Sequence, residues 1–203
     1  MTTMLRPRWM ILLGAVAILL FVLASRALAE APRIDGWMLE PGVDVPSYAV
    51  TEPASTNLNI DTVLLMCEEG ASSRIVQLKL YLSDAGPLLP KGFDESALKH
   101  HPGIEVVIDE RIYPARLYFS DDYVLVADTE RERFPVVSEF LLDAMANGRS
   151  MILRFDLIAG RQAFDSELVV NLQAGKGGRA VNAVRRCAAP TDDRLVAIAP
   201  AGD

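Results

Sequence analysis

Hydrophobic residues alternate with polar ones along several short stretches of this chain, and this period of two constrains the fold more than any other feature. In the clearest stretch, Val76, Leu78 and Leu80 are separated by Gln77 and Lys79. Side chains of a β-strand point alternately to its two faces, so this pattern is typical of a strand with one buried face. The alternation, or a β-rich composition, predicts seven strands, at residues 58–67, 75–82, 104–108, 112–119, 123–127, 151–158 and 162–172.

Short helical signals lie between some of these strands and after the last one. Asp94 can begin a helical turn, and Ser138 is a natural N-cap for a helix over residues 138–146. A third helix is expected at residues 179–188. Strands with short connections, and helices that do not alternate with them, favour antiparallel pairing. The sequence therefore predicts a mainly β (α+β) fold, an antiparallel β-sandwich of about seven strands with two or three short helices.

The domain organisation follows from the distribution of proline and of β patterns. Four prolines in residues 30–56 oppose helix formation and most strand pairing. This segment is expected to be an extended or loosely packed leader, which Trp37 and its two neighbours attach in part to the domain. Residues 57–188 then form a single β-rich domain. Residues 189–203, which are polar and contain alanine and proline, are expected to form a flexible tail.

The first 29 residues have the three parts of a secretory signal peptide. Two arginines make the end positive, residues 9–24 form an unbroken apolar run, and the sequence Ala-Leu-Ala places small residues at the −3 and −1 positions. The predicted signal segment is therefore residues 1–29, with the cut between Ala29 and Glu30. The alternative is an uncleaved anchor that tethers the protein to a membrane, although the run is short for a span.

The two cysteines of the chain, Cys67 and Cys187, both follow the signal segment. An exported protein meets an oxidising compartment, where a lone pair of cysteines usually forms a disulfide. The alternative is a redox-active thiol pair, but that chemistry commonly uses a C-x-x-C spacing. Because Cys67 ends the first predicted strand and Cys187 ends the last predicted helix, the bond is expected to clamp that helix to the sheet.

The charge balance bears on the class of partner. The chain has 20 basic and 27 acidic side chains and a formal charge of −7, which becomes −10 when the three arginines of the signal segment are removed. Nucleic-acid binding needs lysine and arginine against phosphates, so no nucleic-acid partner is expected. We expect an unknown protein or an envelope component as the partner, and contact with a membrane only through an uncleaved signal segment.

Few side chains are candidates for metal or cofactor chemistry. His100 and His101 are the only histidines, and Asp94 and Glu95 precede them with oxygen ligands. Neighbouring side chains on a helix point about 100° apart, so two adjacent imidazoles do not easily share one metal ion. A position at a helix end, just before the Pro-Gly stop at residues 102–103, explains the pair better. No metal ligand and no cofactor-binding residue is therefore predicted.

Three further patterns have simple structural explanations. Asp121 and Asp122 lack the spacing of a calcium loop and are expected to form a turn. The Gly-Lys-Gly-Gly sequence at residues 175–178 lacks the P-loop spacing and is expected to connect a strand to a helix, with weak anion binding as the alternative. Arg154 and Asp156 share one strand face, as a solvated or cross-strand charged pair. No catalytic residue is predicted, since no G-x-S-x-G sequence is present; a Ser-His-Asp triad assembled from distant parts of the chain stays open as an alternative.

The order of elements over residues 58–188 resembles a known group of exported proteins. A signal peptide precedes a strand ending in Cys67. A Val-Gln-Leu-Lys-Leu strand, a Val-Ile-Asp sequence before a hairpin, and an Ala-Val-Asn-Ala-Val helix leading to Cys187 follow. The outline resembles small proteobacterial β-sandwich proteins of the invasion-associated locus B type, and is similar to type VI secretion accessory proteins of the VasI type. The resemblance implies a periplasmic or outer-envelope protein without an established chemistry.

These observations favour a non-catalytic function in an exported protein. We expect a periplasmic or secreted envelope-accessory or protein-interaction domain. The alternative is a periplasmic hydrolase that acts on an envelope polymer, since many carboxylates are available for such work. Carboxylates that converge in a deep cleft would favour the hydrolase, whereas a flat surface with an exposed apolar patch would favour the interaction domain.

Overall fold

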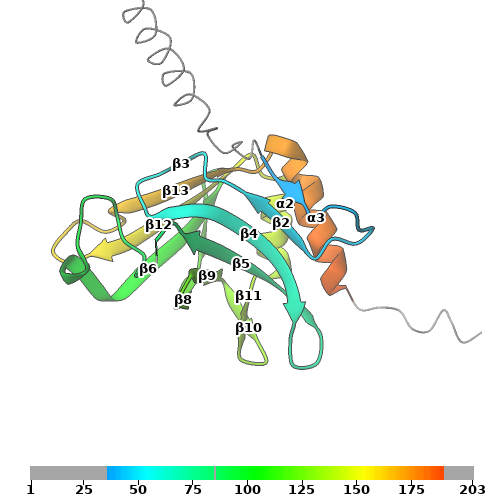
Figure 1. Cartoon of the computed structure of the whole chain (residues 1–203), viewed down its shortest axis with the longest axis horizontal. Helices are drawn as coiled ribbons and strands as arrows, with labels where there is room; N and C mark the ends of the chain where they lie inside the picture. Colours follow the sequence, from blue (N-terminus) through cyan, green and yellow to red (C-terminus); the bar gives the residue numbers. More distant parts are fainter. Residues whose placement is uncertain (1–35, 85, 190–203) are drawn as a thin grey trace, which may run out of the picture. The chain divides into compact units, whose positions relative to one another are not determined.

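Thirteen β-strands, paired in three antiparallel sheets, form the framework of residues 36–84 and 86–189, the part of the chain that the computed structural model describes (Figure 1). The fold is therefore mainly β and antiparallel, as predicted. The predicted signal segment 1–29, its cut between Ala29 and Glu30, and residues 190–203 of the predicted tail lie outside the described residues.

The largest sheet has six strands around a long central pair. β4 (Ile60–Glu69) and β5 (Arg74–Leu82) pair along their whole length, and their inward side chains, such as Leu65 and Leu78, are fully buried. On one side of this pair lie β2 (Tyr48–Thr51) and then β1 (Met38–Leu39), and on the other side lie β9 (Tyr123–Ala127) and then β8 (Arg116–Phe119).

The second sheet has five strands and shares its core with the first. In spatial order its strands are β3 (Ser55–Thr56), β13 (Ser166–Asn171), β12 (Ser150–Ile158), β6 (Leu98–Ile108) and β7 (Arg111–Pro114). Its buried side chains, among them Leu153 and Phe155, belong to the same hydrophobic cluster as those of the six-stranded sheet. The third sheet is the hairpin of β10 (Thr129–Arg131) and β11 (Phe134–Val136).

One stretch of chain passes from the second sheet to the first. β7 pairs with β6, whereas β8, which begins two residues after β7 ends, pairs with β9. Pro114 lies at the end of β7, which is an edge strand. Proline lacks a backbone N–H, so an edge position or an irregularity is where it is tolerated in a sheet.

Two α-helices pack beside the sheets at the right of Figure 1. α2 (Glu139–Asn147) begins at Ser138, whose side chain accepts a hydrogen bond from the backbone N–H of Leu141, as its N-cap sequence predicts. α3 (Gly177–Ala188) contacts α2, β4 and β5, and its last turn carries Cys187. Ion pairs from Arg185 to Glu139 and Asp143 link the two helices.

The predicted disulfide is present and joins α3 to the six-stranded sheet. Cys67 of β4 and Cys187 of α3 are bonded, with their Cα atoms 6.1 Å apart. Both side chains are at least nine-tenths buried, and Nη1 of Arg74 lies 3.0 Å from Sγ of Cys187. The last helix is therefore clamped to the buried side of β4, which leaves the other side of the sheet free of α3.

Trp37 packs against the connection between β13 and α3. Its side chain is 4% exposed, and its backbone N–H donates to the carbonyl oxygen of Ala174. A Cβ atom on Gly175 would lie 2.7 Å from the backbone nitrogen of Trp37, and one on Gly177 would lie 2.7 Å from its Cδ1. Gly175 is therefore required by the close approach of Trp37 and by its positive φ of 59°, and Gly177 by the close approach of Trp37 and of the carbonyl oxygen of Leu172.

Several expectations from the sequence need correction. The structure has thirteen strands in place of about seven, because strands of two to four residues, such as β1 and β3, are too short to show a period of two. Residues 36–56, the described part of the predicted extended or loosely packed leader, contribute three short strands. β2 pairs with β4, and β3 pairs with β13, in the stretches between the prolines.

The helix expected between Asp94 and the Pro-Gly sequence at residues 102–103 is not present. The side chain of Asp94 does cap a turn, but this is a single 3-10 turn at Glu95–Ala97, and residues 98–108 form β6. Pro102 is tolerated inside β6 because the register between β6 and β12 shifts opposite Asp156 and Ile158, where the ladder is interrupted.

Candidate functional site

The outward side of the six-stranded sheet carries a band of tyrosine and aliphatic side chains. The cross-strand register places Val50, Leu64, Lys79, Leu125 and Tyr118 in one row over five strands. A second row contains Tyr48, Met66 and Gln77, and a third contains Thr62, Tyr81 and Tyr123. We call this surface the tyrosine face; its members are Tyr48, Val50, Thr62, Leu64, Met66, Gln77, Lys79, Tyr81, Tyr118, Tyr123 and Leu125.

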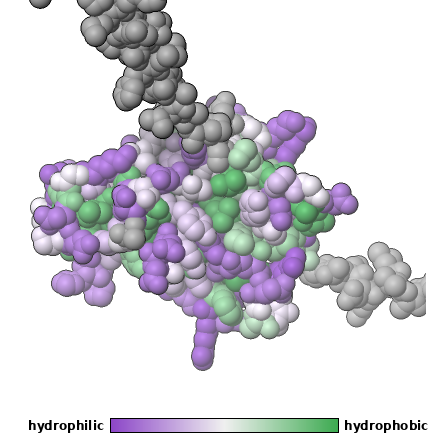
Figure 2. Space-filling view, viewed as in Figure 1, coloured by the Kyte–Doolittle hydropathy of each residue, from purple (hydrophilic) through white to green (hydrophobic). Residues whose placement is uncertain are grey.

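The tyrosine face is partly accessible. With the exceptions of Gln77 and Lys79, all of its side chains are half-buried. Figures 1 and 2 look onto the side of β4 and β5 from which α3 is absent, and Figure 2 shows hydrophobic residues over β2 and β4 among hydrophilic neighbours. Five strands at a spacing of about 4.8 Å make a surface roughly 20 Å wide, which is wide enough for a protein partner.

Lys79 lies at the centre of the tyrosine face and is only 5% exposed. Its Nζ forms an ion pair with Oε1 of Glu68 and lies 4.8 Å from the ring centroid of Tyr123. The ring of Tyr123 also lies 5.5 Å from that of Tyr81. The carboxylate and the ring compensate the buried ammonium, so Lys79 holds neighbouring side chains together and presents little free charge.

A shallow cleft of about 430 Å³ opens at the β8 end of the tyrosine face. The hydroxyl of Tyr118 donates a hydrogen bond of 2.7 Å to Oε1 of Glu130, and Nη1 of Arg116 lies 3.8 Å from the same oxygen. The cleft is lined by Pro114, Ala115, Arg116, Tyr118, Ala127, Asp128, Thr129 and Glu130. The cleft therefore extends the tyrosine face with polar groups that can give directional contacts.

The hydrogen bond to Glu130 raises the pKa of Tyr118 above its usual value of about 10, because donation to a carboxylate requires the protonated phenol. Replacement of Glu130 by Gln removes this charged acceptor, and we expect the pKa of Tyr118 to fall toward its usual value. Alkaline ultraviolet titration measures phenolate formation. The wild type should show one tyrosine that ionises later than in Glu130→Gln, and superimposable titrations would contradict this arrangement.

The second carboxylate of the cleft, that of Asp128, has a structural role. Oδ1 of Asp128 accepts the backbone N–H of Ser138 at 2.7 Å, and Oδ2 accepts the Ser138 hydroxyl. Asp128 therefore fixes the start of α2. Because Glu130 is bonded to Tyr118, both acids of the cleft have partners in the described part of the chain.

The structure places the sequence-predicted metal candidates in β6 and in the turn before it. His100 and His101 are exposed residues of β6, and not residues at a helix end. Asp94 caps the 3-10 turn before β6 through Ser96. Across residues 36–84 and 86–189, no group of three His, Cys, Asp or Glu side chains is arranged to hold a metal ion.

The other three patterns have the structural roles that the sequence predicts. Asp121 and Asp122 form the turn between β8 and β9. Residues 175–178 lie where the connection from β13 meets α3, which begins at Gly177. Arg154 pairs with Glu105 at 2.6 Å, and Asp156 pairs with Lys99, in both cases between β12 and β6. No helix within the described residues is long and apolar enough to cross a membrane.

The tyrosine face itself was not predicted from the sequence. Gln77 and Lys79 alternate with leucines and were expected on the exposed face of a half-buried strand, yet both are 5% exposed. The long Lys79 side chain lies along the sheet to reach Glu68, and Nε2 of Gln77 donates to the carbonyl oxygen of Pro135. The sequence feature that could have indicated this face is the number of tyrosines at outward strand positions. Which of these tyrosines are neighbours depends on the register between the strands.

The comparisons with known proteins assign no family to this chain. It matches no protein-family model, no curated protein and no solved structure.

Proposed function

We propose that this protein is an exported, non-catalytic interaction domain of the cell envelope that binds a protein partner through the tyrosine face. The observation that carries the proposal is the band of half-buried Tyr48, Tyr81, Tyr118 and Tyr123 with Leu64, Met66 and Leu125 on one open sheet surface. Contiguous apolar surface of this kind is uncommon on proteins without a partner.

The composition of the tyrosine face suits a protein partner. Tyrosine, methionine and arginine are enriched at protein interfaces, and tyrosine combines a large apolar area with a polar end. Lys79 and Glu68 neutralise each other at the centre of the face, so a partner that covers them does not bury an isolated charge there. The cleft at Arg116, Tyr118 and Glu130 supplies polar contacts at the rim.

The location follows from the N-terminal sequence and from the disulfide. A signal segment at residues 1–29 directs the chain out of the cytoplasm, and a disulfide such as Cys67–Cys187 is typical of oxidising compartments. We also infer that the two larger sheets pack as the predicted sandwich, since their buried side chains belong to one core. The location outside the cytoplasm agrees with the periplasmic or outer-envelope location that the resemblance to locus B proteins implies.

Site-specific photo-crosslinking in intact cells tests the proposal. A photoreactive amino acid replaces Leu64 or Leu125 on the tyrosine face, or Ile112 on β7, which is 60% exposed and serves as the matched control. We expect discrete crosslinked products from positions 64 and 125 and far less product from position 112. Equal products from all three positions, or none from the tyrosine face, would rule the proposal out.

The hydrolase alternative has a candidate location in the cleft that contains Glu130 and Asp128. The commitment of Asp128 to Ser138 and the shallow shape of the cleft favour the interaction domain over this alternative. The Glu130→Gln variant separates the two functions. Hydrolysis of an envelope polymer that is lost in this variant would establish the alternative.

A further inference from the structure

We infer that the partner of the tyrosine face presents a basic segment, in which arginine or lysine side chains alternate with apolar ones. This inference rests on the proposed function and identifies the chemistry of the partner. The supporting observation is a group of negatively charged side chains without ion pairs at one end of the tyrosine face.

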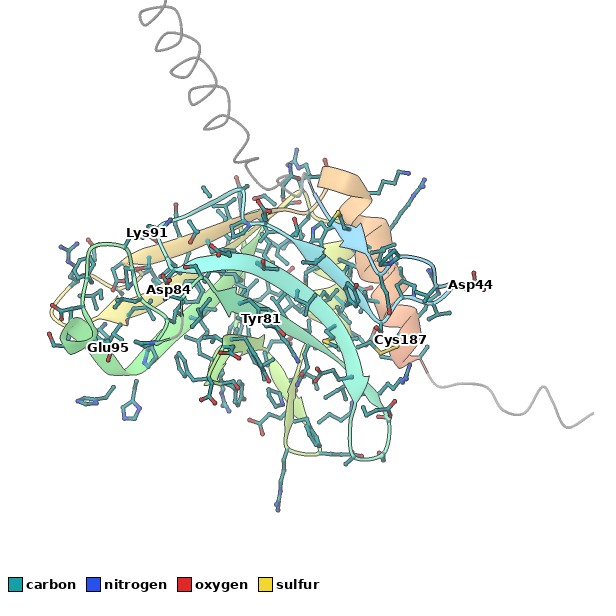
Figure 3. All side chains as sticks on the ribbon, viewed as in Figure 1. Asp44, Tyr81, Asp84, Lys91, Glu95 and Cys187 are labelled. Carbon is teal, nitrogen blue, oxygen red and sulfur yellow. A yellow bond between two sulfur atoms is a disulfide. The ribbon has the colours of Figure 1, made fainter. Side chains whose placement is uncertain are left out.

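Four aspartates surround the end of the tyrosine face at which Tyr81 and Tyr123 lie. Leu82, the last residue of β5, brings two of them together. It pairs with Ile60, the residue before Asp61 in β4. The backbone N–H of Leu82 also donates to the carbonyl oxygen of Asp122. Asp84 follows β5 by two residues, and Asp121 lies beside Asp122 in the β8–β9 turn. Figure 3 shows Asp84 to the left of Tyr81, on the side away from Asp44. The four members of this acidic rim are Asp61, Asp84, Asp121 and Asp122.

The acidic rim is exposed and takes part in no ion pair among the described residues. All four side chains are exposed, and within the described residues their carboxylates have no ion pair and no hydrogen bond. By contrast, Glu68 is paired with Lys79 on the tyrosine face, and Glu130 is paired with Arg116 in its cleft. The acidic rim therefore presents unpaired negative charge to a docked partner at one end of the tyrosine face.

A cationic side chain of a partner can make two separate favourable interactions at this end of the tyrosine face. It can approach the carboxylates of the rim, and it can lie over the half-buried rings of Tyr81 and Tyr123, whose faces attract cations. Along β5, Tyr81, Lys79 and Gln77 are two positions apart from one another in turn, so that Tyr81 and Gln77 are roughly 13 Å apart. An extended segment of about five residues therefore spans the rim and the aliphatic row of Leu64 and Leu125 together.

Titration with synthetic peptides tests the inference on the full exported chain. The probe is an extended eight-residue peptide of alternating arginine and leucine. The comparison peptides replace every arginine by glutamate, or every leucine by serine. We expect the arginine–leucine peptide to bind most tightly, to perturb the amide resonances of Tyr81, Tyr123 and Leu125, and to bind more weakly as salt is raised. Equal binding of the glutamate–leucine peptide would overturn the inference.

Two charge variants locate the effect. Asp121→Asn/Asp122→Asn removes two charges from the rim and keeps a residue type suited to the turn. Asp44→Asn/Glu110→Gln removes two charges from exposed residues in the β1–β2 loop and the β6–β7 turn. The rim variant should raise the Kd for the arginine–leucine peptide about three- to tenfold, while the control variant should change it less than twofold. An equal change in both variants would mean a general attraction and would overturn the inference.

The same variants distinguish this inference from the proposed function. If position 64 or 125 still forms its crosslinked product and the rim variant leaves its yield unchanged, the tyrosine face has a partner but not a basic one. If no product forms at either position, the proposed function fails as well.

Discussion

Replacement of both cysteines by alanine, in the variant Cys67→Ala/Cys187→Ala, should lower the free energy of unfolding by about 2–5 kcal/mol, the range typical of small secreted domains. The bond joins residues 120 apart in sequence, so its loss allows the unfolded chain many more conformations. It also frees α3 from β4. Urea denaturation followed by the fluorescence of Trp37, which is buried in the native state, measures the change.

The controls for this prediction use the same bond. Each single variant should cost nearly as much as the double variant, because either change removes the whole disulfide. Labelling of denatured, unreduced protein with a thiol reagent should find no reactive thiol in the wild type. Two reactive thiols per chain, or a double variant as stable as the wild type, would contradict the prediction.

Replacement of Trp37 by alanine should lower the free energy of unfolding by about 3–5 kcal/mol, the cost typical of truncating a large buried aromatic side chain. Trp37 is 4% exposed and fills the space left by Gly175 and Gly177 in the β13–α3 connection. Its loss would leave a cavity bounded by backbone that cannot readily collapse. Thermal or urea unfolding followed by circular dichroism measures the effect, because this variant lacks the tryptophan signal of the folded domain.

Trp37→Phe is the matched control for the cavity. The indole N–H is buried and has no acceptor among the described residues, so phenylalanine removes an unsatisfied donor and retains most of the apolar volume. We expect Trp37→Phe to cost clearly less than Trp37→Ala. Equal costs would show that the indole N–H contributes a hydrogen bond, and a cost below about 1 kcal/mol for alanine would contradict the packing role.

The predictable parts of the fold are those whose signal is local in sequence. The alternation at residues 75–82 predicts β5 with an error of one residue, and Ser138 predicts the start of α2. The helix expected after Asp94 was wrong because a capping residue and a few helix formers are a weak signal, and pairing of β6 with β12 outweighed it. The short strands β1 and β3 were missed because pairing partners, and not their own residues, stabilise them.

The features of the candidate site also differ in whether a local sequence signal or a contact between distant residues determines them. The sequence by itself determined the longer strands and the pairing of Cys67 with Cys187, since a chain with two cysteines leaves each of them one possible partner. Only the tertiary structure decided that Tyr118 and Tyr123 share a surface with Lys79, and that Lys79 is buried against Glu68. The physical reason is register, because a shift of one residue between two strands moves every outward side chain of one of them to the opposite face.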